Sequence, residues 1–124
     1  MKITIHRGTD QIGGCVTEYE HEGWKLFVDY GEQLPGVPKS NLLDIAGLTK
    51  GDITKSALLI THYHGDHIGC ISQLPKELPM YMGELGREIQ LVYSKRMSKV
   101  DNKQAIVIER LNAAKVFRPG QPFS

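Results

Sequence analysis

The sequence has no histidine after residue 67, although it carries five in all. It also lacks long apolar runs, and none approaches the roughly 18 residues that a membrane-spanning helix needs. Neither sign of charge is in excess, because 15 Lys and Arg are balanced by 14 Asp and Glu, which leaves a net charge of +1. The overall charge therefore implies neither a membrane nor a nucleic acid as partner.

Several familiar signatures are absent. The glycine-rich loop at 8–14, GTDQIGG, is not a Walker loop because no Gly-Lys-Ser/Thr follows it. No Gly-x-Ser-x-Gly occurs, so serine hydrolase chemistry has no support. The N-terminus has no apolar core of signal-peptide length, and the two cysteines, Cys15 and Cys70, lie far apart. We therefore expect a cytoplasmic protein in which both thiols are buried and do not form a disulfide.

What remains is the composition of a folded domain. A chain of 124 residues, 40% hydrophobic and 23% charged, suffices for one ordinary domain or for a piece of a larger one. Apolar periodicity predicts a mixed α/β (α+β) fold without strict alternation of strands and helices. Strands are expected at 2–7, 15–21, 24–30, 56–60, 79–82 and 113–118, and helices at 41–48, 68–74 and 83–97, with 105–111 ambiguous.

The most informative stretch is residues 61–70, THYHGDHIGC, which directly follows a short apolar run. Neutral imidazoles and carboxylates are good ligands for zinc and similar divalent metals. In an extended segment His62 and His64 point the same way, so we expect them to hold one ion. Asp66 and His67 would hold a second. A lone His-x-His is more often surface or core, but three imidazoles buried without metal would leave many nitrogens unsatisfied.

Two divalent ions would give this cluster hydrolytic chemistry. A water bound to such ions loses its proton near neutral pH, and the hydroxide can attack a carbonyl or phosphorus centre. We expect Asp66 to orient that water or to take its proton, which makes Asp66 the candidate catalytic residue. Zinc is the first expectation for the metal, with manganese and iron as alternatives that suit the same ligands.

The motif THYHGDHIG resembles the His-x-His-x-Asp-His signature of the metallo-β-lactamase superfamily. The flanks resemble its nuclease-like branch, which includes ribonuclease J. In this sequence, as in that branch, a Gly-rich loop precedes a strand that ends in Asp-x-Gly, here residues 29–31. Residues 79–93 resemble the strand and helix that follow the metal motif in the branch. The resemblance implies a four-layer αβ/βα sandwich, and we expect residues 1–124 to be a single partial domain, about its first half.

The resemblance also implies roles for individual residues. His62 and His64 would bind the first metal, and Asp66 and His67 the second. Asp29 would support the site without being a ligand, although a strand-end turn former is an equally good interpretation of that aspartate.

In this superfamily, later residues complete the site with a third histidine, a bridging aspartate and a final histidine. This chain offers only His6 and His21 upstream, and Asp101 is its one later aspartate, in a polar stretch where we expect a surface loop. We therefore expect an N-terminal fragment rather than an eroded enzyme. The sheet face that the missing half would cover should then drive self-association.

For the parent protein, the resemblance implies a metal-dependent hydrolase that cleaves phosphodiester bonds in RNA or DNA. One alternative keeps the fold but changes the substrate to a small ester, thioester, lactone or phosphorylated metabolite, because a fold alone does not decide the substrate. A second alternative is that the isolated chain is catalytically inactive, because it offers only two ligands per ion.

Overall fold

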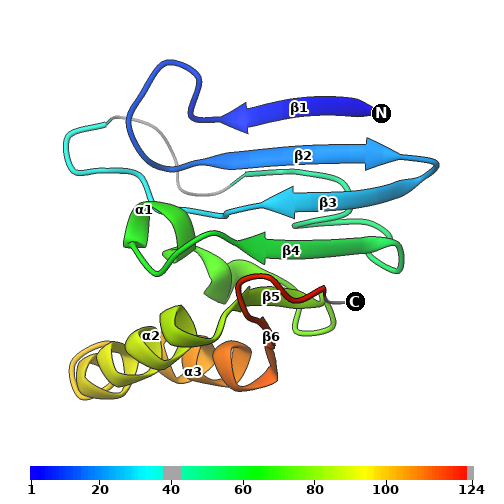
Figure 1. Cartoon of the computed structure of the whole chain (residues 1–124). Helices are drawn as coiled ribbons and strands as arrows, with labels where there is room; N and C mark the ends of the chain where they lie inside the picture. Colours follow the sequence, from blue (N-terminus) through cyan, green and yellow to red (C-terminus); the bar gives the residue numbers. More distant parts are fainter. Residues whose placement is uncertain (38–42, 123–124) are drawn as a thin grey trace.

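A computed structural model of the chain describes residues 1–37 and 43–122. These residues form one six-stranded sheet in which the spatial order of the strands follows their order in the sequence (Figure 1). The first three strands are antiparallel, and the last three run parallel to the third. The strands are β1 (Lys2–Arg7), β2 (Val16–His21), β3 (Trp24–Val28), β4 (Ser56–Ile60), β5 (Met80–Gly83) and β6 (Lys115–Phe117). The expected mixed α/β class is confirmed.

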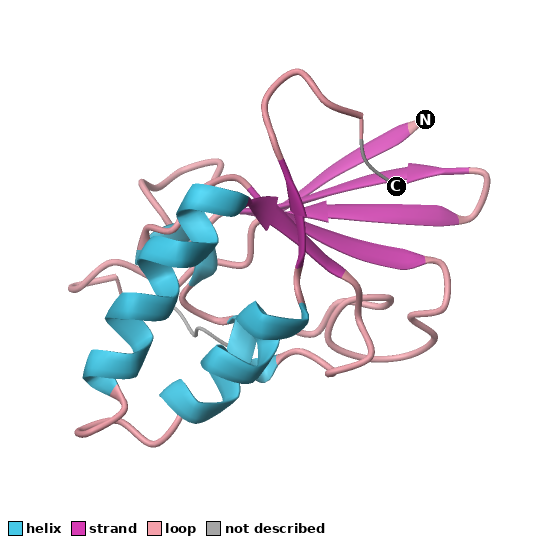
Figure 2. Cartoon of the chain, turned by 60° about the horizontal axis from the view of Figure 1, so that its bottom comes forward, coloured by secondary structure: helices cyan, strands magenta, loops and turns pink. Residues whose placement is uncertain are grey.

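The helices lie on one side of this sheet (Figure 2). They are α1 (Gly65–Ile68), the 3₁₀ turn η1 (Ile71–Gln73), α2 (Glu84–Met97) and α3 (Gln104–Ala113). The ambiguous segment 105–111 is therefore helical. Among the described residues, no helix is both long enough and apolar enough to cross a membrane.

Alternation along the strands decides which side chains meet the helices. On the helix-covered face, Phe27, Leu58, Ile60 and Met82 are almost completely buried. They form the core together with side chains from the helices, such as Leu111. The free energy of this burial holds the helical layer on the sheet.

The opposite face carries a row of partly exposed apolar side chains across the first three strands. Ile3 pairs with Tyr19, and Tyr19 pairs with Leu26, so these residues share one face with Ile5. Ile3 is 58% exposed and Ile5 is 53% exposed. We call Ile3, Ile5, Tyr19 and Leu26 the open sheet face. A sheet covered on one face only is the layering expected of one half of an αβ/βα sandwich.

Three expectations about local structure need correction. The helix expected at 41–48 is wrong for 43–48, which forms a turn around Gly47, whose φ of +88° interrupts a helix; residues 41 and 42 lie outside the described residues. The helix expected at 68–74 is wrong: this range holds only the last residue of α1 and the 3₁₀ turn η1, because Cys70, with φ −103° and ψ 9°, breaks the helix and Leu74 is already extended. The strand expected at 113–118 is shorter, because β6 covers only Lys115–Phe117.

Helix α2 does not bury its apolar stripe. Leu85 and Val92 are 74% and 70% exposed, while Leu91 and Ser94 face the interior. Gln90 is also buried, and its side-chain amide donates a hydrogen bond of 3.3 Å to Ser94 Oγ. The inward side of α2 is thus partly polar, and this side helps to line a pocket described below.

Candidate metal centre

The histidine cluster lies where β4 ends, at the carboxyl edge of the parallel strands. This edge is where open α/β sheets bind their ligands. His62 and His64 follow β4 in an extended loop, and His67 lies on α1. The ring centroids of His62 and His64 are 4.7 Å apart, and those of His62 and His67 are 4.0 Å apart. The fold therefore brings all three imidazoles together.

Asp66 completes the group that the sequence predicts. Its Oδ2 lies 3.4 Å from Nε2 of His67, and both side chains are half-buried. In the part of the chain that the structure describes, no group of three or more His, Cys, Asp or Glu side chains could hold a metal ion. The donor types suit a divalent ion, but they are present as incomplete sets: His62 with His64, and Asp66 with His67.

Asp29 is buried beneath the cluster, with 4% of its surface exposed. Its φ of 63° is unusual for a residue other than glycine, although aspartate tolerates it better than most residues do. Its Oδ2 lies 2.7 Å from Nδ1 of His67, and its Oδ1 accepts a hydrogen bond of 2.8 Å from the backbone N–H of Thr61. A carboxylate on Nδ1 selects the tautomer that leaves Nε2 of His67 free, as second-layer partners of metal ligands do.

Thr61 extends this network to a second imidazole. Its hydroxyl lies 2.8 Å from Oδ2 of Asp29 and 3.0 Å from Nδ1 of His62. If the hydroxyl donates to Asp29, it accepts from Nδ1–H of His62, and Nε2 of His62 is left free. Asp29 therefore orients His67 directly and His62 through Thr61. Sequence reasoning missed Thr61, whose only signal was its place between the strand and the motif.

The backbone of α1 is held by the chain that follows β3. Tyr30 N–H donates to the carbonyl of His67 at 2.9 Å, and Glu32 N–H donates to the carbonyl of Gly65 at 2.9 Å. Gly31 lies between them, so close that a Cβ on it would be 1.7 Å from the carbonyl oxygen of Asp66. Only glycine allows this approach. The Asp-x-Gly segment thus supplies the carboxylate under the cluster, and its backbone packs directly against α1.

The thiol of Cys15 lies near two carboxylates of this region. Burial raises the pKa of Cys15, and the carboxylates of Asp29 and Asp66 raise it further. Cys15 and Cys70 are both free cysteines, as expected, but only Cys70 is buried, whereas Cys15 is half-buried.

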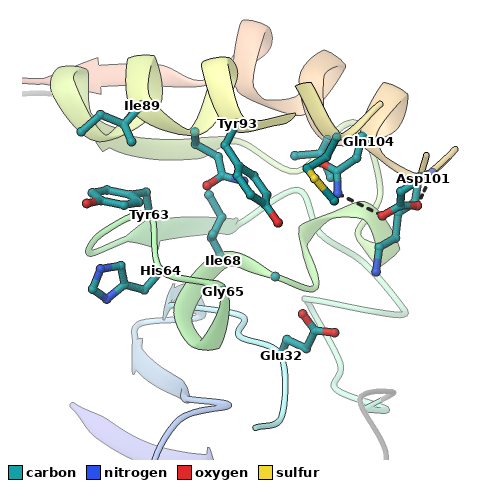
Figure 3. A pocket seen from close by; sticks show the side chains of 14 residues that line it. Glu32, Tyr63, His64, Gly65, Ile68, Ile89, Tyr93, Asp101 and Gln104 are labelled. Carbon is teal, nitrogen blue, oxygen red and sulfur yellow. Dashed lines mark hydrogen bonds between the residues drawn. The ribbon is translucent and has the colours of Figure 1, made fainter. Parts of the chain in front are cut away.

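A pocket of about 450 Å³ adjoins the cluster, between the motif loop and the helices α2 and α3 (Figure 3). His64 and Tyr63 line it from the motif loop, and their rings are 5.0 Å apart in an edge-to-face arrangement. Asp101 lines it from the turn between the helices, as Figure 3 shows. The loop around Asp101 is exposed at 98–100 and 102–103, as expected, whereas Asp101 itself is half-buried and lines this pocket.

Comparison with known proteins gives matches to part of the chain. No family model matches it. Ribonuclease J of Mycolicibacterium smegmatis is 36% identical over 83 residues, which are 64% of this chain and 15% of the relative. Ribonuclease J of Mycobacterium tuberculosis is 35% identical over the same length and shares. A crystal structure of a protein of unknown function from Enterococcus faecalis V583 superposes with a TM-score of 0.67 at 21% identity, over 82% of this chain and 31% of that one.

The ribonuclease J matches support the metallo-β-lactamase superfamily, which the motif resembles. The structural match concerns the fold alone. The chain spans about 15% of the length of the ribonuclease J relatives, so the activity and substrate of the whole protein are proposals.

Proposed function

We propose that the protein is a metal-dependent hydrolase of the nuclease-like branch that cleaves phosphodiester bonds in RNA or DNA. The observation that carries the proposal is the contact of Asp29 with His67, extended by Thr61 to His62. The buried Asp29 carboxylate favours the tautomers of His67 and His62 in which Nε2 carries no proton. This is the arrangement that metal-ligating histidines have. Similarity to ribonuclease J over 83 residues favours a nucleic acid over a small metabolite as substrate.

His62 and His64 would hold one divalent ion, and Asp66 and His67 would hold the second. Zinc is the first candidate, and manganese or iron would suit the same donors. When bound, such ions supply Lewis acidity and charge stabilisation for hydrolysis. Further ligands would come from other parts of the protein, because each pair is an incomplete set.

The chain's own residues set the tautomer and the orientation of two imidazoles in the site. Asp29 accepts a hydrogen bond from Nδ1–H of His67, and the Thr61 hydroxyl, which donates to Asp29, accepts one from Nδ1–H of His62. Asp66 is the candidate catalytic residue because its half-buried carboxylate lies beside His67 and can take a proton from the attacking water. The backbone N–H of Cys15 donates a hydrogen bond of 3.3 Å to the carbonyl of Asp66 and so limits how far that residue can move.

The isolated chain offers two donors per ion, so we expect it to bind zinc at less than one equivalent and to be inactive. Metal analysis of the purified 124-residue chain tests this expectation. Two tightly held ions per chain would contradict the incomplete-site hypothesis.

The activity is tested in the full-length protein with labelled RNA and DNA, with zinc or manganese and with a chelator. Cleavage should require metal and should be largely lost in His64→Ala. The matched control is His21→Ala, which removes an exposed imidazole at the far end of β2. Equal cleavage in both variants, or cleavage that survives the chelator, would remove the cluster from the mechanism.

A further inference from the structure

The glycine-rich loop at 8–14, which joins β1 to β2, packs against Asp66. Strands β1, β3 and β4 end at the same edge of the sheet, so the loop after β1 lies at the same end as α1 (Figure 1). Gly13 lies against the side chain of Asp66, because a Cβ on Gly13 would be 2.8 Å from Cβ of Asp66 and 3.1 Å from its Oδ2. Directly after the loop, Cys15 N–H donates to the carbonyl of Asp66 at 3.3 Å. The loop therefore limits the positions that the Asp66 carboxylate can take.

A single buried cation joins this loop to the Asp-x-Gly segment. Arg7 is the last residue of β1 and is 6% exposed. Its Nε donates a hydrogen bond to the carbonyl of Gly14 in the loop, and its Nη2 donates one to the carbonyl of Gly31. The guanidinium is planar and rigid, so its N–H groups hold the two carbonyls at a fixed separation.

The same guanidinium reaches the chain just after α1. Burial raises the pKa of the Cys70 thiol, and the positive charge of Arg7 together with a hydrogen bond from its side chain works against that rise. Cys70 lies two residues beyond the end of α1. A buried guanidinium is costly unless its N–H groups have acceptors, so these contacts hold Arg7 in place. Arg7 thus connects the loop and the segment that both contact Asp66 with the chain that follows it.

We propose that Arg7 is a positioning residue for the second metal ion, because it holds the glycine-rich loop against Asp66 and so sets the orientation of that carboxylate. The inference rests on the proposed function, in which Asp66 and His67 hold this ion. His62, which would help to hold the first ion, is oriented through Thr61 instead. Loss of Arg7 should therefore weaken the binding of the second ion more than that of the first.

Zinc binding by the full-length protein, measured without substrate, tests the inference. Competition with a chromophoric chelator resolves the two binding steps, and the variants His62→Ala and Asp66→Asn show which step belongs to which ion. Arg7→Met should weaken the step assigned to Asp66 about tenfold, as loss of a supporting residue does in metal sites. The other step should change by less than about twofold. A merely structural role would weaken both steps alike.

Arg110→Met is the matched control for loss of a buried guanidinium contact. Arg110 is half-buried on α3, and its Nη2 donates a hydrogen bond of 2.8 Å to the carbonyl of Leu74. This variant removes the same kind of hydrogen bond as Arg7→Met does, but it leaves the loop and Asp66 in place. It should bind both ions like the unchanged protein.

Gly13→Ala tests the contact of the loop with Asp66 while Arg7 stays in place. The added Cβ would press on the Asp66 side chain, so this variant should also weaken the second step about tenfold. Gly23→Ala is its control: φ is +79° at Gly23 and +77° at Gly13, but a Cβ on Gly23 would meet no atom of the described residues within 4 Å. Gly13→Ala keeps the inference falsifiable if Arg7→Met does not fold.

Equal weakening of both steps in Arg7→Met, or a second step that Arg7→Met and Gly13→Ala both leave unchanged, would overturn the inference. Its failure is distinct from failure of the proposed function. Two bound zinc ions, with Arg7→Met behaving like Arg110→Met, would reject the positioning role alone. A full-length protein that binds no zinc would reject the metal-dependent hydrolase and the positioning role with it.

Discussion

Oδ2 of Asp29 lies 2.7 Å from Nδ1 of His67, although the two residues are 38 positions apart in the chain. The contact ties the end of β3 to the first turn after β4, and the two strands are parallel neighbours in the sheet. Because Asp29 is buried, its carboxylate needs hydrogen-bond donors, and the cluster side of the sheet supplies them. The same contact that satisfies Asp29 sets the orientation of a candidate metal ligand.

Asp29→Asn should lower the zinc affinity of the full-length protein about 10–100-fold, the usual cost of losing such a supporting group. Asparagine tolerates the positive φ at this position, so the fold should survive. Zinc competition with a chromophoric chelator measures the change. Asp44→Asn is the control, because Asp44 is an exposed carboxylate paired with Lys50. Equal affinity in the two variants would argue that Asp29 serves only to shape the turn.

Thr61→Val should also weaken zinc binding, by less than Asp29→Asn, because it removes only the link from Asp29 to His62. Thr61→Ser keeps the hydroxyl and should bind zinc like the unchanged protein. The same competition assay compares the two variants. If the Val and Ser variants bind alike, the hydroxyl does not orient His62.

Gly31→Ala should destabilise the protein by about 3 kcal/mol, because its Cβ would collide with the backbone of Asp66 and push α1 away. Gly65→Ala is a matched control in the motif itself, where a Cβ meets nothing within 4 Å. It should change the free energy of unfolding by about 1 kcal/mol or less. Urea unfolding measures both, and a tolerated Gly31→Ala would contradict the close approach described here.

Acid should destabilise the fold through Glu18, which is 4% exposed. Burial alone would raise the pKa of Glu18, but hydrogen bonds from Lys25 and His6 outweigh it and hold the pKa below its ordinary value of 4.5. A lowered folded pKa means that this contribution to stability is complete above the unfolded pKa and is lost as the pH falls through the folded pKa.

Glu18→Gln should therefore reduce stability near pH 7 and flatten the dependence on pH below about 4.5. Urea unfolding between pH 3 and pH 7 checks this, with Glu22→Gln as a control at an exposed carboxyl. A pH dependence equally steep in both variants would show that Glu18 does not carry the effect.

The predicted self-association concerns the open sheet face. Ile5→Lys and Leu26→Lys place charges on that face, so they should shift the chain towards monomer in light-scattering measurements. Val100→Lys is the control, because Val100 is 78% exposed in the turn after α2. A stable, soluble monomer of the unchanged chain would contradict the prediction.

Much of the fold could be predicted from local patterns. The alternation in β1 and β2, the short apolar run of β4 and the length of α2 each depend on neighbouring residues only. The helix expected at 41–48 was wrong in its described part because Gly47 and the buried Ile45 and Leu48 favour a turn that packs on the sheet. The inward side of α2 was not predictable, because packing against α3 and the pocket outweighs its apolar stripe.

By itself the sequence determined the donor types and their order: two histidines after a buried strand, then an aspartate and a third histidine. It also determined the Asp-x-Gly at the end of β3. Only the tertiary structure decided that Asp29 lies under His67 and that Thr61 links it to His62. The physical reason is that ligand identity is a property of single side chains, whereas orientation comes from contacts between strands and helices distant in the chain.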